Sequence, residues 1–182
     1  MLRSLVGSEM CIRDRYDINI ALPPPLIDRE HRYTLRERLD VKGRVLIAPV
    51  QAEIDALVER IAEGNYESVA IGFIHSYVNG AHERQLRDAL QARLPQLSIS
   101  ISSEVSPQMR EFERFNTVCA NAYVKPLIKS YLDRLVVTLK ESGADCPVFM
   151  IHSGGGIISV QSAAEFPVRL VESGPAGGAI FA

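Results

Sequence analysis

Two glycine-rich segments have the residue types and spacing that could bind a negatively charged group. The first is HSGGG at residues 152–156, and the second is SGPAGG at residues 173–178. Glycine tolerates the positive φ of a sharp turn from a strand into a helix, and the amides at a helix start can bind phosphate or carboxylate. A turn that only reverses the chain direction, with no ligand, would require the same spacing of glycines. The candidates for lining a nucleotide or substrate are Ser153, Gly154, Gly155, Gly156, Ser173, Gly174, Gly177 and Gly178.

Several common catalytic motifs are absent from the sequence. HSGGG is superficially similar to the oxyanion-hole turn of lipases, but that chemistry requires a G-x-S-x-G nucleophile elbow, which the chain lacks. It also lacks a P-loop and a G-x-G-x-x-G motif. An esterase mechanism and the two commonest phosphate-binding loops are therefore excluded.

A polar segment at residues 75–83 contains His75, His82 and Glu83, and imidazole and carboxylate groups can together hold a metal ion. Asn79, however, is a natural N-cap for the helix that follows. His75 would then lie at a strand end and His82 in the first helical turn. We therefore predict structural hydrogen-bonding roles for His75, Asn79 and His82, and we assign no metal ligand.

The charged segment REFERFNT, at residues 110–117, is either a solvated helix face or part of a contact between lobes or subunits. Arg110, Glu113 and Arg114 are the candidates for such a contact. Cys119 lies on the same helical side as apolar neighbours, so we expect a buried and unreactive thiol.

Composition narrows the class of protein. The chain has 182 residues, 47% of them hydrophobic, and a net charge of -2, which favours a globular fold and gives no basic excess for binding nucleic acid. Its three cysteines are odd in number and widely spaced, which favours a reducing, cytoplasmic location over a disulfide framework. The apolar runs are much shorter than the about 18 residues of a membrane-spanning helix.

Hydrophobic periodicity predicts alternating strands and helices. An apolar stripe at residues 54–61 indicates an amphipathic helix. The strands expected at 68–76 and 97–103 should be joined by a right-handed crossover. We expect Glu83 to pair with Arg87 one helical turn later. Pro126 should kink the long helix or divide it in two. The expected strands are 68–76, 97–103, 143–151 and 168–172, and the expected helices are 81–94, 110–142 and a short one opened by Ser159.

Three segments together resemble the hydantoinase A / 5-oxoprolinase family: IGFIHSYVNGAHE, SSEVSPQMREFERFNTVCANAYVKP and MIHSGGGIISVQSAAEFPVRLVESGPAGG. The resemblance implies an α/β fold of the actin-like, ribonuclease-H-like ATPase type, with mixed sheets flanked by helices. It divides the chain into part of the family's N-terminal region, residues 16–118, and the start of its core domain, residues 119–182. Residues 1–15 are interpreted as a foreign leader. Gly80, Phe115 and Gly154 depart from the residues usual in the family.

The resemblance also implies an activity. Members are ATP-dependent hydrolases that open hydantoin or 5-oxoproline by phosphorylating the amide oxygen, with ATP, Mg²⁺ and a companion hydantoinase B/oxoprolinase-type subunit. Alternatives are an ATP-using subunit of an acetone- or acetophenone-type carboxylase, a non-catalytic assembly module, and a small-molecule kinase of the same superfamily. The family's acidic phosphate motifs do not occur in the sequence. The catalytic residues are therefore unknown, and the chain alone is expected to be inactive.

Overall fold

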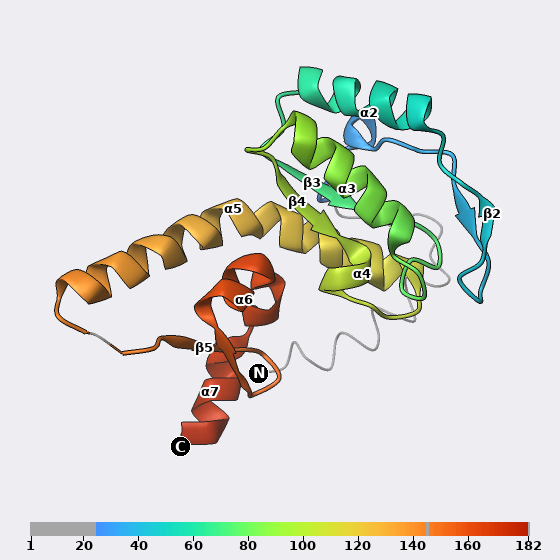
Figure 1. Cartoon of the computed structure of the whole chain (residues 1–182). Coiled ribbons are helices and arrows are strands. Elements are labelled where there is room, and N and C mark those ends of the chain that lie inside the picture. Colours follow the sequence, from blue (N-terminus) through green and yellow to red (C-terminus); the bar gives the residue numbers. More distant parts are fainter. Residues whose placement is uncertain (1–24, 145, 182) are drawn as a thin grey trace, which may run out of the picture.

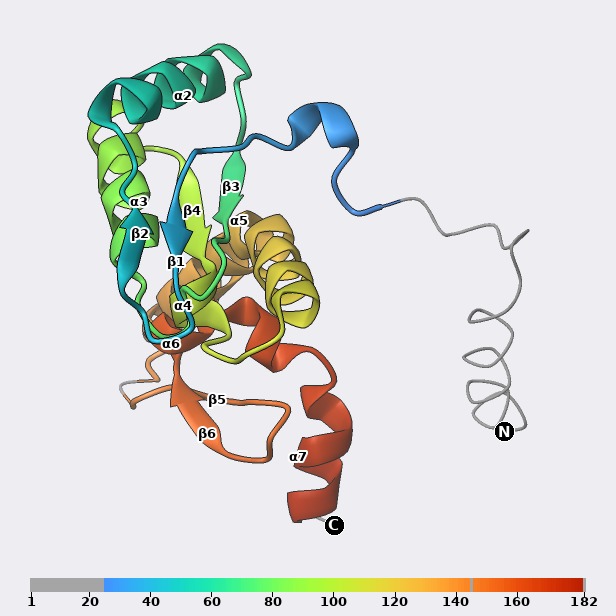
Figure 2. The same ribbon diagram turned by 90° about the vertical axis from the view of Figure 1, so that its right-hand side faces the viewer.

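The computed structural model describes residues 25–144 and 146–181. Its centre is a parallel pair of strands, β3 (Ser68–Ile71) and β4 (Ser98–Ile101), joined by helix α3 (Ala81–Arg93). Helices α2 (Gln51–Glu63) and α3 lie on one side of this pair and the long helix α5 (Glu111–Glu141) on the other (Figures 1 and 2). The predicted strand–helix–strand order is confirmed, although both strands are shorter than expected.

The packing of this part follows the apolar periodicity of the sequence. The predicted stripe on α2 is buried, with Ile54 fully enclosed, and it meets Leu90 of α3 and Ile101 of β4 in one hydrophobic core. Helices cover both faces of the two strands, as is usual for a parallel pair, although only β3 is a short apolar run and β4 alternates Ser and Ile. Side chains of this core are Ile54, Leu57, Val58, Ile61, Ile71, Leu86, Leu90, Leu97, Ile99 and Ile101.

A short antiparallel hairpin precedes α2, after a 3-10 helix at η1 (Arg29–His31). Its strands are β1 (Arg38–Leu39) and β2 (Val45–Ile47), and the carboxylate of Asp40 accepts hydrogen bonds from the amides of Lys42 and Arg44 in the turn. Gly43 in this turn has φ +77, and Nδ2 of the Asn79 side chain donates to the Gly43 carbonyl at 3.0 Å. The hairpin is thereby fixed to the loop that leads into α3.

After the short helix α4 (Ser102–Val105), α5 runs without interruption through Pro126. Of the two alternatives predicted at Pro126, the division into two helices is wrong; Figure 1 shows one continuous helix that bends along its length. Proline removes one backbone hydrogen bond. Buried residues on both sides of it, Ala122, Lys125 and Leu132, hold the flanking turns in contact with the rest of the molecule.

The C-terminal part is a second hairpin followed by helices. Strand β5 (Phe149–Ile151) pairs with β6 (Ile157–Ser159), and α6 (Val160–Glu165) begins at Ser159, whose hydroxyl accepts from the amide of Ser162 as predicted. The strand expected at 168–172 is instead the 3-10 helix η2 (Pro167–Leu170). Pro167 cannot donate to a ladder, and the amide of Val168 donates to the side chain of Asn121 rather than to a strand.

Helix α5 connects the two parts of the fold. It contacts β3 and β4 at its beginning, and α6 and η2 farther along. Leu132 of α5 is buried with Val160 and Ala163 of α6 in a second, smaller core. The predicted domain boundary at 118/119 falls inside this helix. In the described ranges, no helix combines the length and the hydrophobicity needed to cross a membrane.

Candidate functional site

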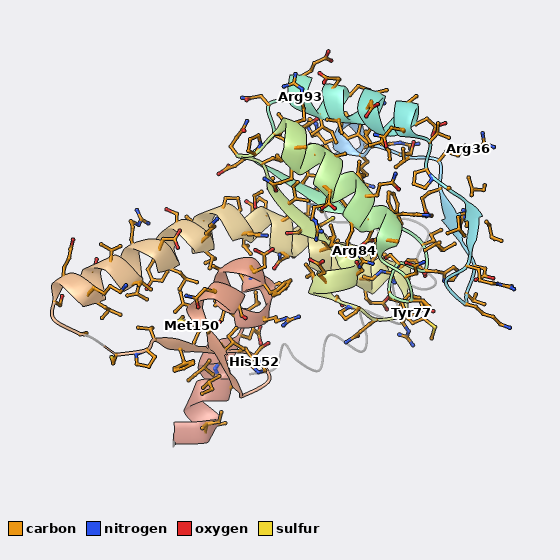
Figure 3. All side chains as sticks on the ribbon, in the orientation of Figure 1. Arg36, Tyr77, Arg84, Arg93, Met150 and His152 are labelled. Carbon is orange, nitrogen blue, oxygen red and sulfur yellow. The ribbon has the colours of Figure 1, made fainter. Side chains whose placement is uncertain are left out.

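The segment 152–156 is the turn of the β5–β6 hairpin, not the entry into a helix that we expected (Figure 3 labels His152 in this turn). The amide of Ser153 donates to the carbonyl of Arg169 at 2.8 Å. The amide of Gly154 donates to Nδ1 of His152 at 3.0 Å, and that of Gly155 to the carbonyl of His152 at 2.9 Å. Three of the four candidate amides therefore already have acceptors within the chain.

The second segment, 173–178, is helical and not a turn. It forms the first part of helix α7 (Ser173–Phe181), directly after Glu172, which has φ +61. The structure brings the two glycine segments together. A Cβ added to Gly177 would lie 3.3 Å from Ile151 of β5, and one added to Gly155 would lie 3.4 Å from Ile180 of α7. Small residues thus allow α7 to lie close against the first hairpin strand and its turn.

These segments do not by themselves form a magnesium–nucleotide site. No group of three His, Cys, Asp or Glu side chains able to hold a metal ion exists within residues 25–144 and 146–181. The amides of the 152–156 turn are largely occupied by the bonds above. The backbone of Ser173 and Gly174 begins a helix and offers donors for an anion, but no acidic cluster stands beside it.

The carboxyl ends of β3 and β4 carry the most extensive buried polar network of the described chain, centred on Glu83. Its side chain is fully buried and accepts from the amide of Phe73 at 2.9 Å, the amide of Ser103 at 2.8 Å and the hydroxyl of Ser102 at 2.6 Å. The predicted Glu83–Arg87 pair is therefore wrong. Arg87 instead pairs with Asp88 and Glu104.

Arg114 completes this network from the first turn of α5. Its Nε donates to the Ser102 hydroxyl at 3.2 Å, and its other nitrogens donate to the carbonyls of Gln108 and Phe73, both at 2.9 Å. The hydroxyl of Ser102 gives its single proton to Glu83, so the hydroxyl of Ser76, 3.1 Å away, must donate to Ser102. One arginine thus joins the loop after β3 to α4 and to the loop that follows α4.

The REFERFNT segment is therefore divided between two roles. Arg114 is only 1% exposed, which contradicts a fully solvated face. Arg110 and Glu113 are exposed and form a loose pair at 3.5 Å, so they are free to contact another lobe or subunit, which stays a prediction. Arg110 also has φ +82, a conformation that disfavours residues other than glycine.

The two histidines of the 75–83 segment have different surroundings. Nδ1 of His82 is 2.8 Å from the carboxylate of Glu37, and both side chains are buried. His75 has φ +60, and its Nδ1 is buried with no hydrogen-bond partner among the described residues. The helix begins at Ala81 as predicted, but its N-cap is Gly80 and not Asn79, although the side chain of Asn79 still accepts from the amide of Ala81 at 3.1 Å.

Proline would be expected at Gly80 from the family resemblance, but the surroundings of this residue explain why a side chain is not tolerated in this chain. A Cβ at this position would lie 2.5 Å from Oγ and 2.9 Å from Cβ of Ser103. Proline also carries a Cβ. The close approach of Ser103 therefore selects glycine here.

A second buried polar cluster, which the sequence did not reveal, joins α5 to the C-terminal part. Nδ2 of Asn121 donates to the Ser100 hydroxyl and to the carbonyl of Glu165, at 3.0 and 3.2 Å. The ammonium of Lys125 donates to the carbonyl of Ile99 at 3.0 Å and pairs with the carboxylate of Glu165. Asn121 and Lys125 lie among the buried apolar residues of α5, so hydrophobic periodicity did not identify them as members of a polar cluster.

The two described cysteines differ in exposure, because Cys119 is partly enclosed whereas Cys146 is exposed. Burial raises the pKa of the Cys119 thiol, so less reactive thiolate is present at a given pH. We expect iodoacetamide at pH 7 to modify Cys146 about tenfold faster than Cys119, as measured by peptide mass spectrometry. The Cys119 rate should keep rising at a pH where an ordinary thiol has levelled off. Equal rates in the folded chain, with urea-unfolded chain as control, would refute this.

Comparison with known proteins gives a consistent result along the chain. Residues 7–94 match the family model described as "Hydantoinase/oxoprolinase N-terminal region", and residues 114–182 match the model described as "Hydantoinase/oxoprolinase". The caprolactamase subunit alpha of Pseudomonas jessenii is 31% identical over 162 residues, which are 89% of this chain and 23% of that protein. The 5-oxoprolinase of Saccharomyces cerevisiae is 30% identical over 138 residues, 75% of this chain and 10% of that protein.

Solved structures agree with these relatives. A nucleotide-free structure of acetone carboxylase superposes with a TM-score of 0.81 at 26% identity, covering 92% of this chain and 24% of the acetone carboxylase chain. The ATP-dependent caprolactamase from Pseudomonas jessenii superposes with a TM-score of 0.80 at 31% identity, covering 89% and 23% of the two chains. The predicted mixed α/β fold is confirmed, and the chain spans about a quarter of the length of these structures.

Proposed function

Because the chain belongs to the hydantoinase/oxoprolinase family, we propose that it is part of an ATP-dependent hydrolase of cyclic amides, of the hydantoin- or 5-oxoproline-opening type. The observation that carries the proposal is the match in both sequence and structure to an ATP-dependent caprolactamase, an enzyme named for its action on a lactam. A lactam is a cyclic amide, as are hydantoin and 5-oxoproline. The activity is proposed for the whole protein and not for this chain alone, because the caprolactamase subunit is about four times as long as the segment that matches it.

ATP and Mg²⁺ would supply activation of the amide by phosphoryl transfer, a step that depends on positioned donors and neutralised charge. In this chain, the proposal assigns the two glycine segments to one wall of the site, because α7 and the 152–156 turn lie against each other. The first amides of α7 are its donors for an anion. The bonded turn at 152–156 acts by holding α7 and β5 in position.

The proposal also includes a partner subunit and a cytoplasmic location. Relatives are named as subunits, including caprolactamase subunit alpha and the acetone carboxylase beta subunit of Xanthobacter autotrophicus, which supports a companion subunit. We propose that this companion is of the hydantoinase B type. Exposed Cys146 is compatible with a reducing cytoplasm.

A carboxylase subunit is the second candidate function, because acetone carboxylase superposes as well as caprolactamase does. Substrate-dependent ADP formation distinguishes the two. We expect the protein, expressed from its gene with its companion subunit, to form ADP when given hydantoin, 5-oxoproline or caprolactam, with an opened ring as product. The 182-residue chain alone should show no Mg²⁺-dependent turnover above background. ADP formation only with acetone and bicarbonate would establish the carboxylase, and a stable phosphorylated substrate would indicate a kinase.

A further inference from the structure

Two enclosed side-chain atoms have no hydrogen-bond partner within residues 25–144 and 146–181, namely Nδ1 of His75 and Oγ of Ser103. A polar atom that is removed from water without a partner costs free energy, so a folded protein retains few of them. His75 carries a second cost, because its φ of +60 lies in the left-handed region that residues other than glycine seldom adopt. Local costs of this kind are concentrated at sites that bind a ligand.

Both atoms lie at one edge of the parallel strand pair. His75 follows the end of β3 and Ser103 follows the end of β4, and the carboxyl ends of parallel strands meet at the same edge. Their chain neighbours Ser76 and Ser102 are joined by a hydrogen bond of 3.1 Å, so the two segments are in contact there. In open α/β sheets, ligands bind outside this edge of the strands. The two free atoms therefore lie where a parallel sheet offers its ligand site.

A free positive charge lies beside Ser103. A Cβ added to Gly80 would lie 2.5 Å from Oγ of Ser103 and 2.9 Å from Nη1 of Arg84, so the hydroxyl and the guanidinium approach the same point. The other two arginines of α3 pair with carboxylates. Arg84 is exposed and has no ion pair or side-chain hydrogen bond among the residues that the structure describes (Figure 3 labels it on α3). Its guanidinium is therefore not held in place and can turn toward a ligand.

We propose that this edge binds the cyclic amide, and that the ring carries a carboxylate, as in 5-oxoproline. The amide has one donor and one acceptor, with which the Ser103 hydroxyl and the His75 imidazole can pair, because each of them can donate or accept. The carboxylate pairs with Arg84 at the first turn of α3, where negative charge is favoured. That the ligand is a cyclic amide rests on the proposed function, and that it is anionic rests on Arg84.

Binding of two ligands tests the role of the charge. The full protein, expressed from its gene with its companion subunit, is titrated calorimetrically in the presence of ADP with 5-oxoproline and with pyrrolidinone, the same lactam ring without the carboxylate. We expect 5-oxoproline to bind about tenfold more tightly, and Arg84→Gln to remove most of this difference. Arg93→Gln is the matched control, because Arg93 is exposed at the other end of α3 and pairs with Glu59 (Figure 3). It should leave the difference unchanged.

Ser103→Ala tests the amide contact. Both ligands should bind about tenfold more weakly, because the amide of the ligand loses a partner. The urea midpoint should stay the same or rise, since this hydroxyl has no partner in the described fold to lose. Ser76→Ala is the contrast, because it removes a buried hydroxyl that is bonded and should lower the midpoint. His75→Phe, which keeps a ring without its nitrogens, should weaken both ligands as Ser103→Ala does.

Other results would overturn the proposal. These are no binding of either ligand, equal binding of both, an equal loss of both in Arg84→Gln, or a lower urea midpoint in Ser103→Ala. Formation of ADP is measured on the same samples with 5-oxoproline. ADP formation that Arg84→Gln leaves unaffected would support the hydrolase and place its substrate elsewhere. Binding without ADP formation would keep this site and remove the proposed hydrolase.

Discussion

Replacing Arg114 with methionine should lower the free energy of unfolding by about 3–5 kcal/mol. The side chain is completely buried, and its fork donates to two carbonyls and to the Ser102 hydroxyl. Methionine fills a similar volume but leaves those acceptors without donors, and the buried carboxylate of Glu83 loses the positive charge that the hydroxyl links to it. Urea unfolding, with the midpoint and the slope both fitted, measures the loss.

The matched control for this variant is Arg110→Met, four residues earlier. That arginine is 77% exposed and pairs only loosely with Glu113, so its replacement should change stability by less than about 0.5 kcal/mol. Arg114→Lys should fall in between, since lysine keeps the charge but not the planar fork. If Arg114→Met and Arg110→Met unfold at the same urea concentration, Arg114 does not hold the two loops together.

Replacing Asn121 with leucine should loosen the C-terminal part selectively, at a cost of about 2–4 kcal/mol. The asparagine is fully buried and exchanges hydrogen bonds with Ser100, Glu165 and Val168. Leucine leaves the Val168 amide and the Glu165 carbonyl without this partner. The substitution should therefore accelerate hydrogen exchange more at residues 160–170 than at residues 81–101, because a region that loses its hydrogen bonds opens more often.

Asn116→Leu is the control for this second experiment, since it makes the same change at an exposed position of the same helix. It should leave the exchange of both regions unchanged. Uniform acceleration across the whole chain in Asn121→Leu would show that the two parts unfold as one unit. That result would contradict a selective role for Asn121.

The sequence predicted those elements whose apolar residues follow one simple period. The α2 stripe, the strand–helix–strand unit and the start of α6 at Ser159 are all confirmed. The errors occur where tertiary contacts override a local preference. Glu83 was placed on a surface ion pair because it lies four residues before Arg87, but three donors from two loops draw it inward. The apolar residues of 168–172 suggested a strand, yet Pro167 and the Asn121 contact accompany a 3-10 helix that ends at Leu170.

The candidate site was less predictable than the fold. The structure places the two glycine segments next to each other, which the sequence did not predict. Their backbone conformations were not predicted either, because a glycine run fits a hairpin turn, a helix start or a helix interior equally well. Whether these residues contact a ligand stays a prediction. Asn121 and Lys125 could not be found from the sequence, since a buried polar residue on a helix leaves no periodic signal of its partners.

The unbroken course of α5 has a mechanical consequence. The buried polar contacts of this 31-residue helix all lie in its first half, at Arg114, Asn121 and Lys125. Beyond Leu132 most of its side chains are exposed or half-buried. A helix rises about 1.5 Å per residue, so a tilt of about 10° at Lys125 would displace the end near Glu141 by about 4 Å. Because Leu132, Leu135 and Val136 of this second half pack in the second core, such a tilt would also move that core relative to the parallel strands.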